Sequence, residues 1–442
     1  MNQKKTSVVF ILAVIALLSA RTCCLAMPKA EKIELPNKLK VLVFEDHSIP
    51  VVTMELLTAA GSWRDPKDMK GLANLTAKSI LLGTRYYTFD DINDRLDFMG
   101  ASLEADCTRD FAIIGMQVLK KELNSAVALF TEIISHPSFP GPDIDGQKDD
   151  IVGSLRIKED DPIEVASRAF DRALFLDSPY AGPVDGTEKS VAAIGTQQIS
   201  KFYSSFYRPN DSILVIGGDI TPREVKASIV PHLTGWEAAQ VPETPFRSEF
   251  AQGTVNVAID KPISQATIMI GCPAMERSSE DYYPFEVMNQ ILGSGDLSSR
   301  LMIAVRVKKG LAYAIESDPA ARKYAGSFRV IIQTKDSSAK ESIALTREEL
   351  ERLRREPVSE AELDAAKKFL IGNFPLKYSE QQDYAKLLAQ IEFYGLGSDY
   401  VEKYPSLING VTSKDILRVA DKYLKPDNVT VIVADLKKAK IE

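Results

Sequence analysis

Histidine is scarce in this chain: His47, His136 and His232 are the only three among 442 residues. None of them lies within helical reach of another, so no helix can offer two imidazoles to one metal ion, a common way to build a zinc site. The sequence therefore excludes a histidine-rich metal site made by this chain alone.

An excess of basic residues is also lacking. The chain has 54 Lys and Arg against 61 Asp and Glu, which gives a formal net charge of −7. A nucleic-acid surface needs a basic excess or stripe, so we expect no nucleic-acid partner. With 45% hydrophobic and 26% charged residues the composition is that of a globular protein, and 442 residues suffice for two or three domains.

The apolar run near the amino end, residues 8–18, is shorter than the roughly 18 residues needed to cross a bilayer. It follows Lys4 and Lys5 and precedes Cys24-Leu25-Ala26, which has small residues where a signal peptidase cuts. We interpret residues 1–26 as a secretory signal, with an uncleaved membrane anchor as the alternative.

Removal of this signal changes the charge and the cysteine content. Three basic residues leave with it, so the mature charge is 51 − 61 = −10. Cys107 and Cys272 remain, which is too few for a disulfide framework. One bridge is possible, but both residues adjoin apolar, strand-like runs, which favours two separate buried thiols.

Two distant parts of the chain resemble each other. Residues 199–216 and 416–433 each combine an amphipathic helix, an aromatic end, a basic residue with proline, and an aliphatic strand. The two prolines, Pro209 and Pro426, are 426 − 209 = 217 residues apart. A second similarity is a strand followed by a helix that ends in Leu-Gly. It occurs at Gly83 in the first half and again at Gly293 in the second, an offset of 293 − 83 = 210. This internal repeat predicts two homologous tandem domains.

Strands and helices come in clusters within each half rather than in strict alternation. This pattern predicts an α+β fold, with a mixed, largely antiparallel sheet packed against helices in each domain. We predict an N-terminal domain over residues 27–235, a linker rich in Pro and Glu over 236–248, and a C-terminal domain over 249–442.

The order of the short motifs resembles the insulinase or pitrilysin family of zinc metallopeptidases, in its small bacterial form related to mitochondrial processing peptidase. The resemblance covers nearly the whole mature chain, and it implies two peptidase-like domains that enclose a chamber with a partner subunit. It rests on these segments, in family-like order: Asn37–Val43, Asp46–Val52, Gly71-Leu72-Ala73, Leu82-Gly83-Thr84, Glu159–Pro162, Tyr207–Asn210, Ser298–Leu301 and Arg306–Tyr313.

Family members that cut peptides carry His-x-x-Glu-His on the helix after the second strand. Two imidazoles hold zinc, the glutamate is the general base, and a later helix supplies a third ligand. The resemblance places Asn74, Ala77 and Lys78 at the motif positions, and Gly153 and Ser154 where the third ligand belongs. None can do this chemistry, so we expect this chain to bind no cofactor and zinc to sit in a catalytic partner.

The second half matches a different functional pair. In family members of this type an arginine and a tyrosine face the zinc site, bind the substrate carbonyl and stabilise the transition state. The matching residues are Arg306 and Tyr313, although Val307 stands where an acidic residue is common. By spacing alone, Arg306 reads as a surface charge and Tyr313 as a half-buried strand residue; the resemblance favours the functional role.

These patterns predict a non-catalytic subunit of an exported, heteromeric zinc peptidase. The implied partners are a homologous catalytic subunit carrying His-x-x-Glu-His and an extended peptide or unfolded substrate, with membrane contact only if the signal is uncleaved. The implied location is the periplasm of a Gram-negative bacterium. A scaffold without a role in proteolysis is the alternative, and no Ser/His/Asp or Cys/His set supports other hydrolase chemistry.

Overall fold

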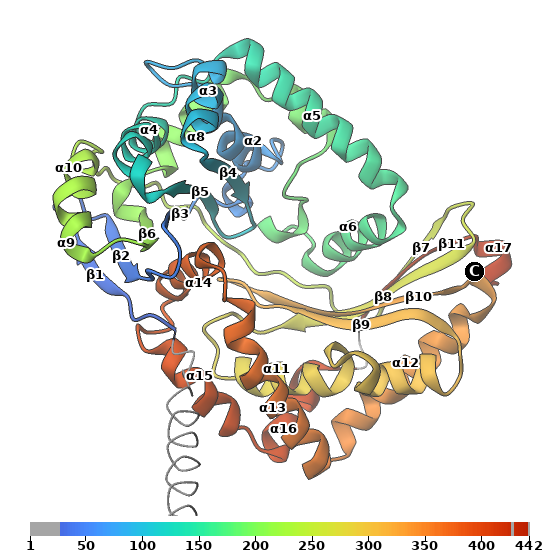
Figure 1. Cartoon of the computed structure of the whole chain (residues 1–442). Coiled ribbons are helices and arrows are strands. Elements are labelled where there is room, and N and C mark those ends of the chain that lie inside the picture. The colour runs from blue at the N-terminus through green and yellow to red at the C-terminus, as the bar shows by residue number, and fades with distance from the viewer. Residues whose placement is uncertain (1–26, 426–427, 441–442) are drawn as a thin grey trace, which may run out of the picture.

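The computed structural model describes residues 27–425 and 428–440, so the predicted signal over 1–26 and Pro426 of the repeat lie outside the described residues. The described chain forms two β-sheets, each associated with helices (Figure 1). This confirms the α+β class with two tandem domains. The boundaries at 235 and 248, and the chamber shared with a partner, stay predictions.

The first sheet has six strands in the order β1-β2-β6-β3-β5-β4. Only β2 and β6 run parallel; the other neighbours are antiparallel. The central strand β3 is buried along almost its whole length, as expected for a strand covered on both faces. The strands are β1 (Glu31–Glu34), β2 (Lys40–Glu45), β3 (Val51–Thr58), β4 (Ser102–Cys107), β5 (Ala112–Leu119) and β6 (Ser212–Gly218).

The second sheet has five strands in the order β7-β11-β8-β10-β9. Its pairing repeats that of the first sheet: β11 runs parallel to β7 and antiparallel to β8, as β6 does with β2 and β3. The internal repeat read from the sequence is therefore a repeat of topology. The strands are β7 (Val255–Asp260), β8 (Gln265–Ala274), β9 (Ala312–Ala320), β10 (Gly326–Lys335) and β11 (Val429–Ala434).

The helices are distributed over both halves, and several begin with a capping box such as that of Thr88 with Asp91 or Thr412 with Asp415. The first half contains α2 (Leu72–Ser79), α3 (Phe89–Met99), α4 (Leu123–Ser135), α5 (Gly141–Asp160), α6 (Pro162–Phe175), α7 (Glu188–Ala193), α8 (Thr196–Phe206), α9 (Pro222–Glu224) and α10 (Val230–Leu233). The second contains α11 (Tyr282–Asn289), α12 (Ala339–Arg355), α13 (Glu360–Lys377), α14 (Gln381–Tyr394), α15 (Tyr400–Asn409), α16 (Ser413–Tyr423) and α17 (Leu436–Ala439).

The two halves exchange one helix each (Figure 1). Helix α6 of the first half packs on β8 and β11 of the second sheet, and α14 of the second half packs on β3 and β6 of the first. Phe170 of α6 joins a buried cluster with Met269 and Val431, while Tyr384 of α14 meets Phe44 edge to face at 5.0 Å. The starts of the two helices are 381 − 162 = 219 residues apart, so the exchange obeys the repeat.

The predicted linker, residues 236–248, contacts both halves. Arg64 donates hydrogen bonds to the carbonyl of Pro242 and the hydroxyl of Thr244, both at 3.2 Å. Phe246 stacks on Tyr324 of the second half, with ring centroids 4.7 Å apart. The segment is therefore packed against both halves.

Two further observations bear on the sequence predictions. Cys107 and Cys272 are both free and buried, as the separate-thiol interpretation predicts. Within residues 27–425 and 428–440, no helix is long and apolar enough to cross a membrane.

Candidate functional site

Helix α2 carries the positions of the zinc motif. It begins after Gly71, whose φ of +95° is a conformation that suits glycine. The Asp65 carboxylate accepts hydrogen bonds from the backbone N–H of Gly71 and of Ala73, both at 2.8 Å, and so caps the helix. The local fold of the family's catalytic helix is thus built even though its catalytic residues are absent.

Asn74 is buried at the first motif position, and the residues around it form a charge-neutral set. Its Nδ2 lies 3.5 Å from Oδ1 of Asp185, a long contact. The other oxygen of Asp185 is 2.5 Å from Nζ of Lys158 on α5. The carboxylate beside Asn74 is therefore already neutralised by a protein ammonium, which leaves little attraction for a metal ion.

The other two motif positions offer no metal ligand and no base. Ala77 is fully buried in the core between α2 and the first sheet. Lys78 is partly exposed and cannot bind a cation while protonated. A general base is missing at the one place on this helix where the family needs it.

Helix α5 offers no third ligand at the expected positions. Gly153 and Ser154 are exposed, and a side chain built on Gly153 would meet nothing within 4 Å. The neighbouring side chain that does point into the domain is Leu155, which is buried among apolar residues. The residues on α2 and α5 do not fit zinc, and the described residues contain no group of three or more His, Cys, Asp or Glu arranged to hold a metal ion.

Arg306 and Tyr313 lie in the second half, on either side of a tight turn. Arg306 belongs to the π-helical turn Met302–Val307, and Tyr313 is the second residue of β9. Gly310, with φ of +63°, donates its N–H to the carbonyl of Arg306 at 2.9 Å, and Leu311 donates to Val305 at 3.0 Å. These bonds hold helix and strand together at the turn.

Both side chains of this pair face solvent. Tyr313 is 48% exposed, and its hydroxyl makes no hydrogen bond to any described residue. Arg306 is exposed, and its one polar contact within the described chain is with Sδ of Met302 at 4.0 Å. No hydrogen bond or ion pair between described residues joins this pair to α2 or α5, so within one chain the two candidate sites are separate.

Sequence reasoning missed three polar residues at the α2 position: Asp65, Lys158 and Asp185. Asp65 occurs six residues before Gly71, a spacing that suits no standard cap pattern. Lys158 and Asp185 lie 27 residues apart and meet only through tertiary structure. Burial raises the pKa of the Asp65 carboxyl to about 7, against the opposing effect of its two backbone hydrogen bonds.

Comparison with known proteins places both halves in one family. Residues 40–188 match the insulinase family, peptidase family M16, and residues 193–370 match the peptidase M16 inactive domain. The non-peptidase homolog YmxG of Helicobacter pylori is 25% identical over 402 residues, 91% of this chain and 93% of that protein. An uncharacterized zinc protease of Streptomyces coelicolor is 24% identical over 393 residues, 87% of this chain and 85% of that one.

Solved structures show the same fold. A peptidase M16 inactive domain from Pseudomonas fluorescens superimposes with a TM-score of 0.85 at 24% identity, covering 92% of this chain and 98% of that one. A protease from Helicobacter pylori gives a TM-score of 0.84 at 20% identity, covering 92% and 99%. The chain therefore belongs to the insulinase family of peptidases, family M16, as a homologue in which the zinc motif is absent.

Proposed function

We propose that this chain is the non-catalytic subunit of an exported, heteromeric zinc metallopeptidase. A homologous partner carrying His-x-x-Glu-His supplies zinc and the general base. This chain closes the chamber and contributes Arg306 and Tyr313. The guanidinium fork and the phenol hydroxyl both donate hydrogen bonds, so they suit a substrate carbonyl oxygen on which negative charge develops.

The observation that carries this proposal is the free state of both side chains. A structural arginine usually forms an ion pair, as Arg300 does with Glu362 at 2.7 Å. Arg306 has no such pair among the described residues, and the Tyr313 hydroxyl has no hydrogen-bond partner there. The turn at Gly310 nevertheless fixes the backbone of both, which is what a preorganised pair of donors needs.

The strand that carries Tyr313 also suits an extended substrate. Within the described chain, β9 is an edge strand that pairs only with β10, and β4 is the corresponding edge of the first sheet. An edge strand can accept an extended peptide as an additional strand. Peptide or unfolded protein is therefore the substrate class that we propose.

The test is to tag this chain in its own host and purify it gently. We expect a homologue carrying His-x-x-Glu-His to co-purify, with bound zinc and peptide cleavage that a chelator abolishes, while the tagged chain alone has neither. Isolation of the chain without such a partner would contradict the proposal. Amino-terminal sequencing of the same material and cell fractionation test cleavage after Ala26 and location in the periplasm.

A scaffold without any role in proteolysis is the second candidate. It is favoured by the loss of every zinc-motif residue and by the name of the Helicobacter pylori relative, a non-peptidase homolog. Under this alternative the chain assembles with a partner, but replacement of Arg306 leaves peptide cleavage by the assembly unchanged.

A further inference from the structure

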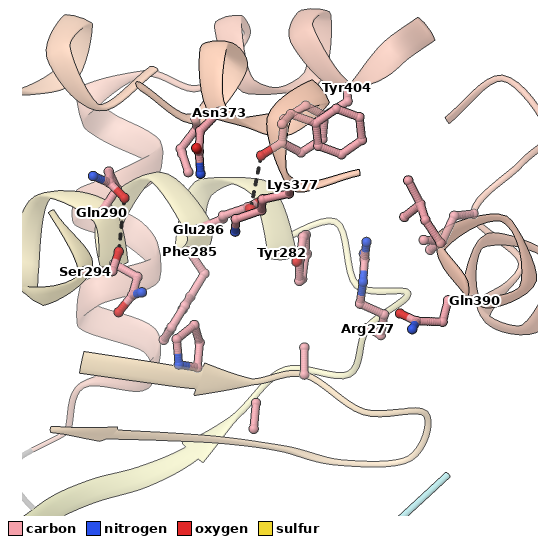
Figure 2. A pocket seen from close by; sticks show the side chains of 18 of the residues that line it. Arg277, Tyr282, Phe285, Glu286, Gln290, Ser294, Asn373, Lys377, Gln390 and Tyr404 are labelled. Carbon is pink, nitrogen blue, oxygen red and sulfur yellow. Dashed lines mark hydrogen bonds between the residues drawn. The ribbon is translucent and has the colours of Figure 1, made fainter. Parts of the chain in front are cut away.

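A cavity of about 610 Å³ lies in the second half (Figure 2), and neither Arg306 nor Tyr313 lines it. Its wall is formed by α11, α13, α14, α15 and the end of β9. This volume is in the range of pockets that bind small molecules. By the internal repeat α11, which forms part of the wall, corresponds to α2 of the first half.

The wall of the cavity contains the carboxylate of Glu286 on α11. Oε1 accepts a hydrogen bond from the hydroxyl of Tyr404 at 3.1 Å, which Figure 2 marks, while Oε2 is buried without a partner among the described residues. Tyr404 is itself fixed by stacking on Phe374, with centroids 4.0 Å apart. Burial raises the pKa of Glu286, which the nearby Tyr404, Arg277 and Lys377 oppose.

The guanidinium of Arg277 lines the same cavity. Nη2 donates a hydrogen bond to the hydroxyl of Tyr400 at 2.9 Å, and the group lies 3.7 Å from the ring centroid of Tyr282. Nη1 is buried and has no partner within the described chain. In the view of Figure 2 Arg277 and Glu286 lie apart, and in the described structure each bonds to a tyrosine hydroxyl rather than to the other.

Glu286 and Arg277 thus share one cavity without forming an ion pair with each other. Two more charged side chains line it: Asp318, which pairs with Arg329 at 2.9 Å, and Lys377, whose charge acts on Glu286. A buried carboxylate or guanidinium with an unsatisfied atom is costly, so each group favours a ligand that completes its hydrogen bonds. The amides of Asn373 and Gln390 also line the cavity, and neither has a hydrogen-bond partner in the described structure. The rest of the wall combines aromatic side chains with polar ones. The aromatic side chains include Phe285, Phe369, Phe374, Tyr378 and Tyr394, and the polar ones include Asn289, Gln290 and Ser294.

We propose that this cavity binds a small zwitterion with an aromatic or apolar body, of the size of a dipeptide. The ligand's ammonium binds Glu286, its carboxylate binds Arg277, and its body packs against the phenylalanine and tyrosine side chains. A simple cation would leave Arg277 unsatisfied, and a simple anion would leave Glu286 unsatisfied. The site requires neither zinc nor a partner chain, so it stands independently of the proposed function.

The test uses L-phenylalanyl-L-alanine as the probe on the purified full-length chain, with isothermal titration calorimetry. We expect micromolar affinity for the free dipeptide. Its N-acetyl form and its C-terminal amide should each bind about tenfold more weakly, since each loses one charge-assisted hydrogen bond.

Variants assign the two ends of the ligand. Glu286→Gln should bind the free dipeptide and the N-acetyl dipeptide with equal affinity. Arg277→Gln should bind the free dipeptide and the C-terminal amide with equal affinity. If Arg277→Gln does not fold, Arg277→Lys tests the same contact: it keeps the charge but loses the planar fork, so its preference for the free dipeptide over the amide should be smaller than that of the wild type. Glu316→Gln, at an exposed glutamate of β9 outside the cavity, is the matched control and should behave as wild type.

Two results would overturn the proposal. One is equal affinity of the wild type for the free and the capped dipeptides. The other is no heat of binding at several millimolar of the free dipeptide, which would mean that water alone fills the cavity.

Discussion

The ammonium of Lys158 on α5 lies 2.5 Å from the carboxylate of Asp185, on the side of that carboxylate opposite Asn74. Asp185 lies in the segment just before α7, so this carboxylate connects Lys158 of α5 by an ion pair with Asn74 of α2 by a long contact of 3.5 Å. Loss of the zinc motif is therefore accompanied by a local replacement of the positive charge, rather than by an unpaired carboxylate.

This pair predicts how zinc binding responds to reconstruction of the motif. The combined change Asn74→His, Ala77→Glu and Lys78→His should bind zinc weakly, because Asp185 is held by Lys158 and a third ligand is missing. Adding Lys158→Met frees Asp185 and should raise zinc affinity at least tenfold, measured by competition with a chelator. Arg156→Met, also on α5, breaks a pair with Glu188 of α7; it is the control and should not change zinc affinity. If the reconstructed motif binds zinc with the same affinity with and without Lys158→Met, the account is contradicted.

Glu55 predicts a specific dependence of stability on pH. This residue of β3 is fully buried beneath α14, its two oxygens have no hydrogen-bond partner among the described residues, and Gly115 opposite leaves it room. Burial raises its pKa from 4.5 to about 7, with Lys386 and the nearby amide of Gln382 opposing and Glu104 and Asp383 adding to the rise. The protonated form therefore stabilises the native state. That stabilisation is complete below about pH 4.5 and is lost as the pH rises through about 7.

Glu55→Gln should remove this dependence. Urea unfolding at pH 8 should show a free energy of unfolding higher by about 1–3 kcal/mol, and the gain should vanish near pH 4.5. Asp65→Asn is the contrasting control: the pKa of Asp65 is also raised to about 7, but its carboxylate caps α2, so this change should destabilise the protein at both pH values. An identical pH profile for wild type and Glu55→Gln would disprove the assignment.

The helix exchange predicts a steric effect at Gly271 of β8. A Cβ atom there would lie 2.6 Å from the ring of Phe170 on α6 and closer still to the carbonyl oxygen of Phe328. Gly271→Ala should lower the free energy of unfolding by about 1–3 kcal/mol, since both the backbone of β10 and the packed helix α6 have to move. Gly372→Ala on exposed α13, where a Cβ meets nothing within 4 Å, should be neutral or stabilising by up to about 1 kcal/mol. If Gly271→Ala and Gly372→Ala changed the free energy of unfolding equally, that result would argue against close packing of α6 on this sheet.

The two cysteines predict a simple chemical result. Burial raises the pKa of Cys272 to about 12 and that of Cys107 well above its usual value, so thiolate is scarce and inaccessible in both. A thiol reagent such as Ellman's reagent should modify neither in the native protein at pH 8 and both in guanidinium chloride. Rapid labelling of either residue in the native state would refute this.

The internal repeat and the fold class could be predicted from the sequence because both depend on periodic patterns of residues. The segments around the ends of α8 at Phe206 and of α16 at Tyr423 share aromatic, basic and aliphatic positions, and β6 and β11 have the same pairing in the two sheets. The packing of α6 and α14 on the sheet of the other half could not be predicted from the sequence. Helices α6 and α14 have ordinary amphipathic patterns, and nothing in such a pattern tells which sheet the apolar face meets.

The residues of the candidate site also fall into those that the sequence predicts and those that it does not. Asn74, Ala77 and Lys78 were located by the family resemblance, because the flanking segments Gly71-Leu72-Ala73 and Leu82-Gly83-Thr84 fix where the motif belongs. The Lys158 pair with Asp185 and the cavity of Glu286 with Arg277 arise from residues far apart in sequence, which only the fold brings together. Arg306 and Tyr313 stay a prediction as functional residues.

The most direct test of the central claim is the kinetics of the purified complex with Arg306→Ala. The account predicts that kcat/KM for a peptide substrate falls by about 100- to 1,000-fold while assembly and zinc content stay unchanged. Lys309→Ala, at a neighbouring exposed cation, should retain wild-type kcat/KM. An unchanged kcat/KM for Arg306→Ala in an intact, zinc-loaded complex would contradict the account and leave this chain as a scaffold.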